Sequence, residues 1–393
     1  MRSVSAVRSV RAALGAARYL DCDVVLNLPD LHPTGHAALQ LDLTLDDDVI
    51  TACDPRIGLM HRSAEKLFEA RDYRQVLMLA SRHDWLGPFS GEHGAALVIE
   101  EALGITPPER ARWSRTLLAE LTRVSAALAF LAAVDSTVVS ATSAVSTSGP
   151  PSPEPAALML RERIIDHLEQ ATGNRVHPTI TRIGGIALPL RAGWLGQLTE
   201  LITATRASVQ DLAGALDGMT HLAGLAEVSQ ELALSVGASG PVGSASGVTV
   251  DARLLRDYDA YPECRDLLRP FVRASGDAQS RYAAFAHDAL IAMDIIERCR
   301  DRLLDLGDGP VDVPLPKVIR VPDGQTYRMV QTPLGTTGLW LLSVGERSPW
   351  RLKLRTPSFS NIQAMAAALV GVPLEHAATA VASFFLVAGD IDR

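Results

Sequence analysis

Two short segments carry the side chains best suited to chemistry in this sequence. The first, 32–36 (His-Pro-Thr-Gly-His), comes directly before a strand-like stretch. An unperturbed histidine has a pKa near neutrality, so the ring of His36 could donate a proton or a hydrogen bond to a substrate. The second, 82–85 (Arg-His-Asp-Trp), adds an indole, which donates a hydrogen bond but cannot deliver a proton. The alternative interpretation of His36 is a ring that only anchors the turn before the strand.

The cysteines argue against a metal centre on this chain. Cys22, Cys53, Cys264 and Cys299 stand far apart, so the sequence has no Cys-x-x-Cys pair. Typical zinc and iron–sulfur sites use such closely spaced thiolates. Isolated cysteines are typical of a reducing compartment. We therefore expect no metal on this chain and four cysteines that act as small apolar side chains.

Several other classes of protein are excluded by composition and motifs. No Gly-x-Gly-x-x-Gly segment or P-loop is present, so we do not expect the chain to bind NADH or ATP. The net charge is −8, with no block of five Lys or Arg residues, and no nucleic-acid partner is expected. No apolar stretch reaches the roughly 18 residues needed to span a bilayer. Any membrane location must therefore come through partner proteins.

The elements that position these residues follow from the spacing of apolar residues. Alternation over 38–45 and a returning apolar stretch at 49–53 predict two antiparallel strands joined by an acidic turn. Helical patterns cover 63–79, 92–103, 106–134, 156–171, 195–216, 277–306, 361–370 and 374–387. Strands are predicted at 326–331, 339–344 and 350–355. Residues 136–155 are rich in Ser, Thr and Pro, which predicts a flexible insertion.

These elements predict an α+β protein with a predominantly helical core, a small N-terminal antiparallel sheet and a C-terminal α/β segment. The predicted divisions are a disordered extension (1–23), an antiparallel β-subdomain (24–62), the helical core (63–310) and the α/β segment (311–393). The first twenty residues contain Arg, Ser and Ala but no acid. That composition also fits a targeting segment.

Motifs spread along the whole chain resemble one protein family. In order, they are 32–37 (His-Pro-Thr-Gly-His-Ala), 58–66 (Gly-Leu-Met-His-Arg-Ser-Ala-Glu-Lys), 175–177 (Arg-Val-His), 182–185 (Arg-Ile-Gly-Gly), 246–261, 352–359 (Leu-Lys-Leu-Arg-Thr-Pro-Ser-Phe) and 389–393 (Gly-Asp-Ile-Asp-Arg). They resemble the D subunit of respiratory NADH–quinone oxidoreductase (complex I), a relative of the large subunit of nickel–iron hydrogenases. The motifs keep the order of the family from about residue 24 to 393.

The resemblance implies a component of the peripheral arm of a translocase, located at the cytoplasmic face of the cell membrane and not active alone. Its implied partners are an iron–sulfur protein similar to the B subunit, a protein similar to the C subunit and a membrane-arm protein similar to the H subunit. Quinone, the substrate, enters a cavity beside the iron–sulfur partner. FMN and the iron–sulfur clusters belong to the partners, NADH is oxidised elsewhere in the assembly, and this chain binds no cofactor.

The resemblance also assigns roles to single residues. It places His36 beside the quinone carbonyl as the catalytic residue, and it places Trp85 in the quinone pocket, where the family has a Tyr. Arg62, Arg82 and His177 match positions near the terminal iron–sulfur cluster of the partner, where positive charge favours the reduced cluster. Ordinary ion pairs are the alternative interpretation of these arginines.

Departures from the family pattern leave a second function open. Because Trp85 cannot deliver a proton, His83 beside it could substitute, although a solvent-facing His83 is the simpler interpretation. An acidic family segment is replaced by the insertion, which leaves only Asp135 nearby, and 383–385 reads Ser-Phe-Phe where the family has Ser-x-Asp. These losses favour the alternative, a degenerate paralogue that acts as a non-catalytic scaffold or belongs to a related membrane-bound redox complex.

Overall fold

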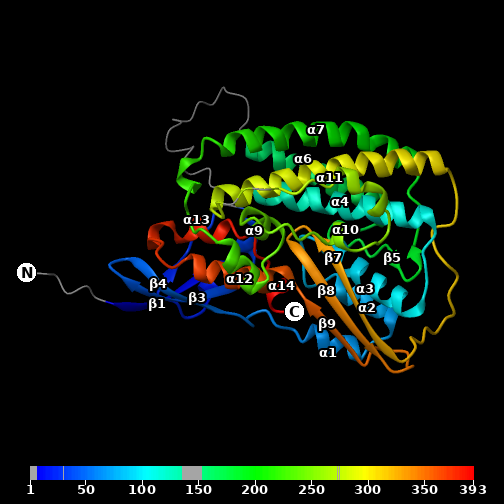
Figure 1. The fold of residues 1–393 in the computed structure, drawn as a ribbon, viewed down its shortest axis with the longest axis horizontal. Coiled ribbons are helices and arrows are strands. Elements are labelled where there is room, and N and C mark those ends of the chain that lie inside the picture. The colour runs from blue at the N-terminus through cyan, green and yellow to red at the C-terminus, as the bar shows by residue number, and fades with distance from the viewer. Residues whose placement is uncertain (1–6, 30, 135–152, 272, 274) are drawn as a thin grey trace, which may run out of the picture.

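A bundle of long helices and two larger sheets make up the chain. The structure is a computed structural model that describes residues 7–29, 31–134, 153–271, 273 and 275–393. Figure 1 shows the long helices along one side of the molecule and the two sheets on the other. The protein is about 51% helix and 15% strand, with one sheet near each end of the sequence. The predicted α+β class is therefore confirmed.

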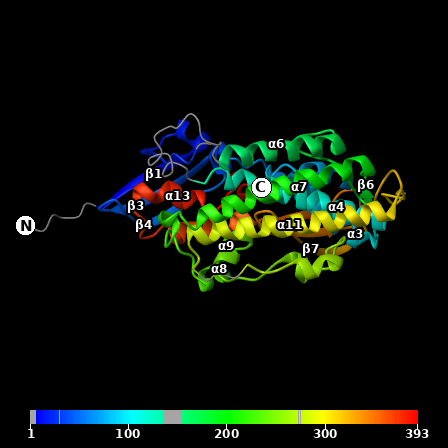
Figure 2. The same cartoon turned by 90° about the horizontal axis from the view of Figure 1, so that it is seen from above.

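Four helices form the core: α4 (Glu109–Leu131), α6 (Pro153–Thr172), α7 (Ala192–Leu216) and α11 (Ala278–Leu306). They run side by side (Figures 1 and 2), with α4 against α6 and α11, and α7 against α6 and α11. Every residue of α4 from 113 to 131 is buried. A helix surrounded in this way is mostly apolar, so its few charged side chains must find partners inside the protein.

The N-terminal sheet contains β1 (Arg8–Leu14), β2 (Val24–Val25), β3 (Leu39–Asp46) and β4 (Val49–Arg56), in the order β2-β1-β3-β4. β3 pairs antiparallel with β1 and β4. Asp47 and Asp48 both have positive φ, as a tight two-residue hairpin turn requires. Leu41 and Leu45 are fully buried. The antiparallel strands predicted at 38–45 and 49–53 are confirmed.

Residues 8–19 form secondary structure, contrary to the predicted disordered extension at 1–23. β1 pairs with β3 along its whole length, and η1 (Gly15–Tyr19) follows it. Arg11 forms a salt bridge of 2.9 Å with Asp42 of β3. Two of the arginines that suggested a solvated segment, Arg8 and Arg11, instead lie on a paired strand. Residues 1–6 of the predicted extension lie outside the described residues.

The C-terminal sheet is a meander of β7 (Gly324–Thr332), β8 (Gly335–Ser343) and β9 (Arg351–Arg355). α3 (Pro88–Leu103) packs on β7 and β8, and α1 (Ala64–Glu69) packs on β9. α2 (Tyr73–Ala80) packs on α3. The three strands predicted between residues 326 and 355 are confirmed, and the helices before them form one apolar core with the sheet.

Two segments predicted as single helices are divided. The helix predicted at 63–79 is interrupted where Asp72 caps α2 by accepting a hydrogen bond of 2.9 Å from the Gln75 amide. The helix predicted at 374–387 becomes η5 (Leu374–His376), α13 (Ala377–Ala382) and, after a break, α14 (Ala388–Ile391). Phe385 has a φ of 54° at this break, and its ring packs edge-on against Phe130. The break redirects the chain so that α14 reaches the loop before α1.

Shorter elements complete the fold. They are η2 (Pro33–His36), β5 (Thr181–Arg182), β6 (Gly185–Ile186), η3 (Thr220–Leu222), α8 (Gln230–Val236), α9 (Gly240–Ala245), α10 (Ala252–Leu255), η4 (Pro262–Leu267) and α12 (Pro357–Ala368). Of the insertion predicted at 136–155, residues 136–152 lie outside the described part, and α6 begins at Pro153. Across the residues described, no helix has the length and apolarity needed to cross a membrane.

Candidate functional site

Four segments that are distant in sequence meet around one pocket of about 310 Å³. We call it the Trp85 pocket. Its lining residues are Met60, Arg62, Ala64, Arg82, His83, Trp85, His177, Gly389, Asp392 and Arg393. Four of the five predicted site residues are among them: Arg62, Arg82, Trp85 and His177. The fifth, His36, is not in the lining; it is the last residue of η2 and is exposed.

The His36 turn is attached to the segment that leads into the Trp85 pocket. The Thr34 hydroxyl donates a hydrogen bond of 2.8 Å to the carbonyl of Leu386, two residues before α14. His32, at the other end of the turn, is buried with its ring edge-on to Phe130, and burial lowers the pKa of His32 to about 3. His32 therefore anchors the turn from inside. That leaves the exposed His36 ring available to a partner or ligand.

The carboxylate of Asp392 shapes the loop at one edge of the Trp85 pocket. It accepts hydrogen bonds from the backbone amides of Gly58 (2.7 Å) and Met60 (2.8 Å). A carboxylate that accepts two amide hydrogen bonds holds a loop firmly. Gly58 has a φ of 102°, a backbone conformation that other residues rarely adopt. This arrangement fixes Arg62, four residues further along, at the pocket wall.

Trp85 lies against the backbone at Gly389. A Cβ atom at position 389 would come within 2.5 Å of the indole ring and of the His83 carbonyl oxygen, so this close approach requires glycine. Asp84 fixes the turn that carries the indole, because its Oδ1 accepts hydrogen bonds from Leu86 (3.0 Å) and Gly87 (2.9 Å). The indole is partly exposed and also contributes to a neighbouring pocket beside α6.

His83 is buried, which corrects the interpretation of a solvent-facing ring. It is 5% exposed, and its Nε2 lies 3.6 Å from Oδ1 of Asp390. Burial lowers the pKa of His83, and the nearby Arg393 and Arg62 lower it further, against the opposing effect of Asp84. Burial also raises the pKa of both Asp84 and Asp390 to about 6. Three titratable groups are thus held together behind the pocket wall.

Two of the arginines at the pocket have no carboxylate partner among the described residues. Arg62 donates a hydrogen bond of 3.0 Å to the carbonyl of Arg82, and both residues are exposed. No carboxylate in the described ranges forms a salt bridge with either guanidinium. Burial lowers the pKa of His177, and the two arginines lower it further. The alternative interpretation of Arg62 and Arg82, ordinary ion pairs, has no support among these residues.

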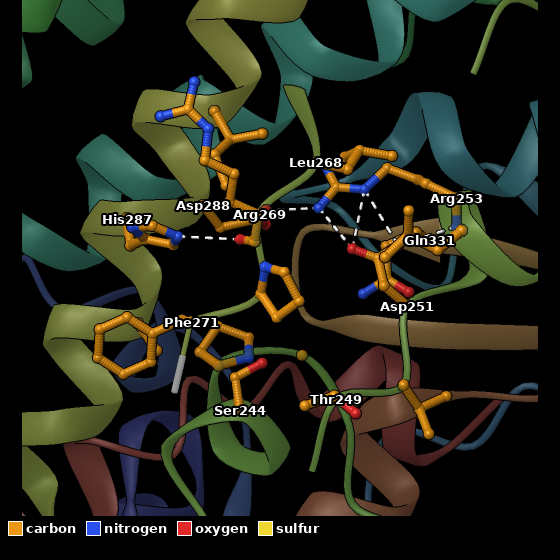
Figure 3. A pocket seen from close by; sticks show the side chains of 17 residues that line it. Ser244, Thr249, Asp251, Arg253, Leu268, Arg269, Phe271, His287, Asp288 and Gln331 are labelled. Atoms are coloured by element: carbon orange, nitrogen blue, oxygen red, sulfur yellow. Dashed lines mark hydrogen bonds and ion pairs between the residues drawn. The ribbon is translucent and has the colours of Figure 1, made fainter. Parts of the chain in front are cut away.

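A second pocket has the opposite arrangement of charge. We call it the Arg253 pocket (Figure 3); its lining includes Asp251, Arg253, His287, Asp288 and Gln331. The Arg253 guanidinium forms salt bridges with Asp251 (2.7 Å), Asp288 (2.6 Å) and Glu120 of α4 (3.2 Å). Each of these carboxylates therefore has a guanidinium partner.

The same ion network continues into the core of the bundle. Arg123 of α4 pairs with Glu120 (2.9 Å) and Asp288 (3.1 Å), and the Tyr261 hydroxyl donates a hydrogen bond of 2.6 Å to Glu120. Although burial opposes ionisation, Arg253 and Arg123 lower the pKa of Asp288 to about 2. The sequence motifs did not predict this network. Its sequence signature is Glu120 and Arg123, three positions apart in the mostly apolar second half of α4.

Two other features considered from the sequence are a metal site and the acid beside the insertion. In the described ranges, no group of three or more His, Cys, Asp or Glu residues is placed to hold a metal ion. Asp135, the acid beside the insertion, is not among the described residues.

The pairing of His83 with Asp390 was not predicted from the sequence, because 307 positions separate the two residues.

Comparisons with known proteins agree on one family. The family described as the respiratory-chain NADH dehydrogenase, 49 Kd subunit, matches residues 149–319 and 313–393. The D 1 subunit of NADH-quinone oxidoreductase from Streptomyces coelicolor is 41% identical over 94% of this chain and 95% of its own length. The D 2 subunit from Salinispora tropica is 39% identical over 98% of both chains. The D subunit from Granulibacter bethesdensis is 32% identical over 94% of this chain and 96% of its own.

Proposed function

Because this chain belongs to the family of the D subunit of NADH–quinone oxidoreductase, we propose that it forms part of the quinone-reduction cavity of such a complex. In this proposal it lies in the peripheral arm, beside an iron–sulfur partner similar to the B subunit. Partners similar to the C and H subunits connect it to the rest of the arm and to the membrane arm. They hold the assembly at the cytoplasmic face of the cell membrane.

One observation carries the proposal. The resemblance assigned Trp85 to the quinone pocket and Arg62, Arg82 and His177 to the neighbourhood of the partner cluster. These residues come from three separate segments of the chain, and all four line the Trp85 pocket. The pocket combines an aromatic ring with unpaired positive charge. An aromatic ring suits a flat ligand, and positive charge suits a neighbouring group that becomes more negative when it is reduced.

In the proposed reaction, electrons from NADH pass through FMN and iron–sulfur clusters of the partners to a quinone held between subunits. The Trp85 indole stacks on or hydrogen-bonds the quinone ring, and His36 donates a hydrogen bond and a proton to one quinone oxygen. Arg62, Arg82 and His177 face the terminal cluster of the partner and favour its reduced form. The chain is not active alone, because the electron carriers belong to its partners.

A scaffold role is the second candidate, and Trp85 is the observation that favours it. The family has a Tyr at this position, and an indole cannot replace its proton. In this alternative the chain holds the arm together, or belongs to a related membrane-bound redox complex, without taking part in quinone chemistry.

The two candidates are separated by substitution of the exposed histidine in the assembled complex. We expect His36→Ala to lower inhibitor-sensitive quinone reduction about 100-fold, the usual scale for loss of a proton donor, without dissociating the subunits. His376→Ala provides the control, because His376 is also exposed but lies on η5, away from the pocket. Unchanged turnover in His36→Ala, with the complex intact, would favour the scaffold.

A further inference from the structure

His83 is a titratable ring at the wall of the Trp85 pocket that the proposed reaction does not use. Its neighbour in sequence, Trp85, occupies the position where the family has a proton-bearing phenol. Quinone reduction consumes two protons. The proposed reaction takes one of them from His36, which does not itself line the Trp85 pocket. The pocket therefore needs a second source of protons, and the indole cannot be that source.

The two nitrogens of the His83 ring have different surroundings. Nδ1 is buried and makes no hydrogen bond of standard geometry; the nearby Ala80 carbonyl favours the protonated ring. Nε2 lies 3.6 Å from Asp390 Oδ1. Because Nδ1 is closed off from solvent, proton exchange with the pocket must run through Nε2. The same nitrogen therefore faces a carboxyl group from α14.

Asp390 is placed to hold a proton for this ring. It is 1% exposed, and its other carboxyl oxygen, Oδ2, accepts a hydrogen bond of 3.0 Å from the Ser358 amide at the start of α12. Oδ1 is thus left toward His83. Burial raises the pKa of Asp390 to about 6, which is close enough to neutrality for the carboxyl group to gain and lose a proton under ordinary conditions.

Three other charged groups, from neighbouring segments, shift the pKa of His83. Asp84 adjoins it in sequence and favours its protonated form, whereas Arg393, after α14, and Arg62, in the loop before α1, disfavour it. Burial and these two arginines therefore disfavour the protonated ring when the pocket is empty. A reduced, negatively charged quinone in the pocket would offset the two arginines and raise the proton affinity of Nε2.

We propose that His83 and Asp390 form a proton-donating pair that supplies one of the two protons consumed when a quinone is reduced in the Trp85 pocket. The inference rests on the proposed function, because it requires a quinone and an electron donor at this pocket. It assigns to His83 the proton-donating role that the phenol at position 85 would have.

Reduction of a quinone to a quinol takes two electrons and two protons. Two electrons reach the quinone one at a time from the reduced iron–sulfur cluster of the partner. Asp390 transfers its proton to Nε2 of His83, and the Nε2–H bond then breaks as an O–H bond forms on one quinone oxygen, while His36 protonates the other. The product is the quinol. His83 is neutral again, and protons from the solvent restore the Asp390 carboxyl group and His36.

The test uses the assembled complex with NADH and a soluble quinone. We expect His83→Gln to lower turnover about 100-fold, because loss of a general acid typically costs 10²–10⁴-fold. The double variant His83→Gln/Trp85→Tyr should recover most of the lost activity, because the phenol restores a proton at the same wall of the pocket. A purely structural role for His83 would not be rescued in this way.

Two further readouts separate proton delivery from electron delivery. The EPR signal of the partner cluster should show normal reduction by NADH in His83→Gln. Turnover of the unsubstituted complex should fall as pH rises through about 6, where Asp390 loses its proton, and this decline should be absent in His83→Gln. His167→Gln is the matched control: His167 is also 5% exposed with a lowered pKa caused by burial, but it stacks on Trp194 in the bundle.

Each outcome decides one of the two claims. A complex that does not reduce quinone before any substitution overturns the proposed function and this inference with it. An active complex in which His83→Gln has normal turnover, or in which Trp85→Tyr does not rescue it, overturns the inference alone. If His83→Gln does not assemble, Asp390→Asn decides instead, because asparagine can still accept the Ser358 hydrogen bond. Normal turnover and an unchanged pH profile in Asp390→Asn would then refute the pair.

Discussion

The Trp85 pocket and the Arg253 pocket both contain buried ionisable side chains, but only the second balances their charges. Around Arg253, every carboxylate of the network pairs with a guanidinium. Around Trp85, Arg62 and Arg82 form no salt bridge with a described acid, and His83 approaches Asp390 only to 3.6 Å. A balanced network can hold helices together by itself. An unbalanced one is left with charge and proton-binding capacity for a partner or a ligand.

This difference follows from position in the fold. The Arg253 network joins α4 and α11, inside the bundle, where an unpaired charge would cost several kcal/mol. The Trp85 pocket lies where the loop before α1, the loop before α3 and α14 converge at the surface. Exposed charges there can be solvated until a partner covers them.

The largest effect is expected when the balanced pocket is broken. Arg253→Met should lower the free energy of unfolding by about 3–5 kcal/mol, because it leaves Asp251, Asp288 and Glu120 without one of their partners in the core. Urea denaturation measures the change. Arg265→Met is the control, because Arg265 pairs with Asp257 at the exposed surface and should change stability by less than about 1 kcal/mol. A similar small loss in Arg253→Met would contradict a closed ion network.

The two regions should lose stability in opposite directions of pH: the Trp85 pocket as pH rises, and the Arg253 network as pH falls. The pKa of Asp390 is raised to about 6, so its contribution is full below its ordinary value of 3.8 and is lost as pH rises through about 6. The pKa of Asp288 is lowered to about 2, so its contribution is present above 3.8 and is lost as pH falls toward 2. Each change is of the order of 1–3 kcal/mol.

Urea denaturation at a series of pH values tests these two windows. Asp390→Asn should flatten the loss of stability between about pH 4 and 7, and Asp288→Asn should remove the loss between about pH 4 and 2. Identical pH profiles in the two variants would show that the regions do not differ in this way.

The smallest effect on stability is expected at the unbalanced pocket. Arg62→Met should change the free energy of unfolding by no more than about 0.5 kcal/mol, because the guanidinium is exposed and unpaired. In the assembled complex, however, removal of the positive charge should lower the midpoint potential of the partner cluster. Redox titration followed by EPR measures that shift. A large loss of stability with an unchanged midpoint potential would show that Arg62 stabilises the fold and does not act on the partner cluster.

Local patterns predicted the elements of this fold better than their arrangement. The alternation at 38–45 identifies β3, because one face of that strand is apolar throughout. The same rule did not identify β1, whose residues do not alternate between apolar and polar; its pairing with β3 makes it a strand, and only its second half, Ala12–Leu14, is buried. The break at Phe385 also has no local cause; it follows from aromatic packing with Phe130 on a distant helix.

The candidate site was predicted by resemblance and not by spacing. The resemblance assigned Trp85 to a quinone pocket with His36, and Arg62, Arg82 and His177 to the neighbourhood of a partner cluster; Trp85 and these last three residues line one pocket, whereas His36 does not, and the assigned roles stay predictions. Nothing in the segment 82–85 indicates that His83 turns inward, because its burial depends on α14, far along the chain. Proton-binding properties that arise from such long-range burial are not visible in a sequence pattern.

The contact between Asp392 and the amide of Gly58 joins residues that are 334 positions apart. A ribosome must therefore translate almost the whole described chain before this loop can take its final form. Until then the loop at Gly58 lacks the carboxylate that holds it, and the Trp85 pocket lacks the wall that α14 contributes. A neighbouring protein can recognise the complete pocket only after α14 has been synthesised, which sets the order in which an assembly containing this chain can be built.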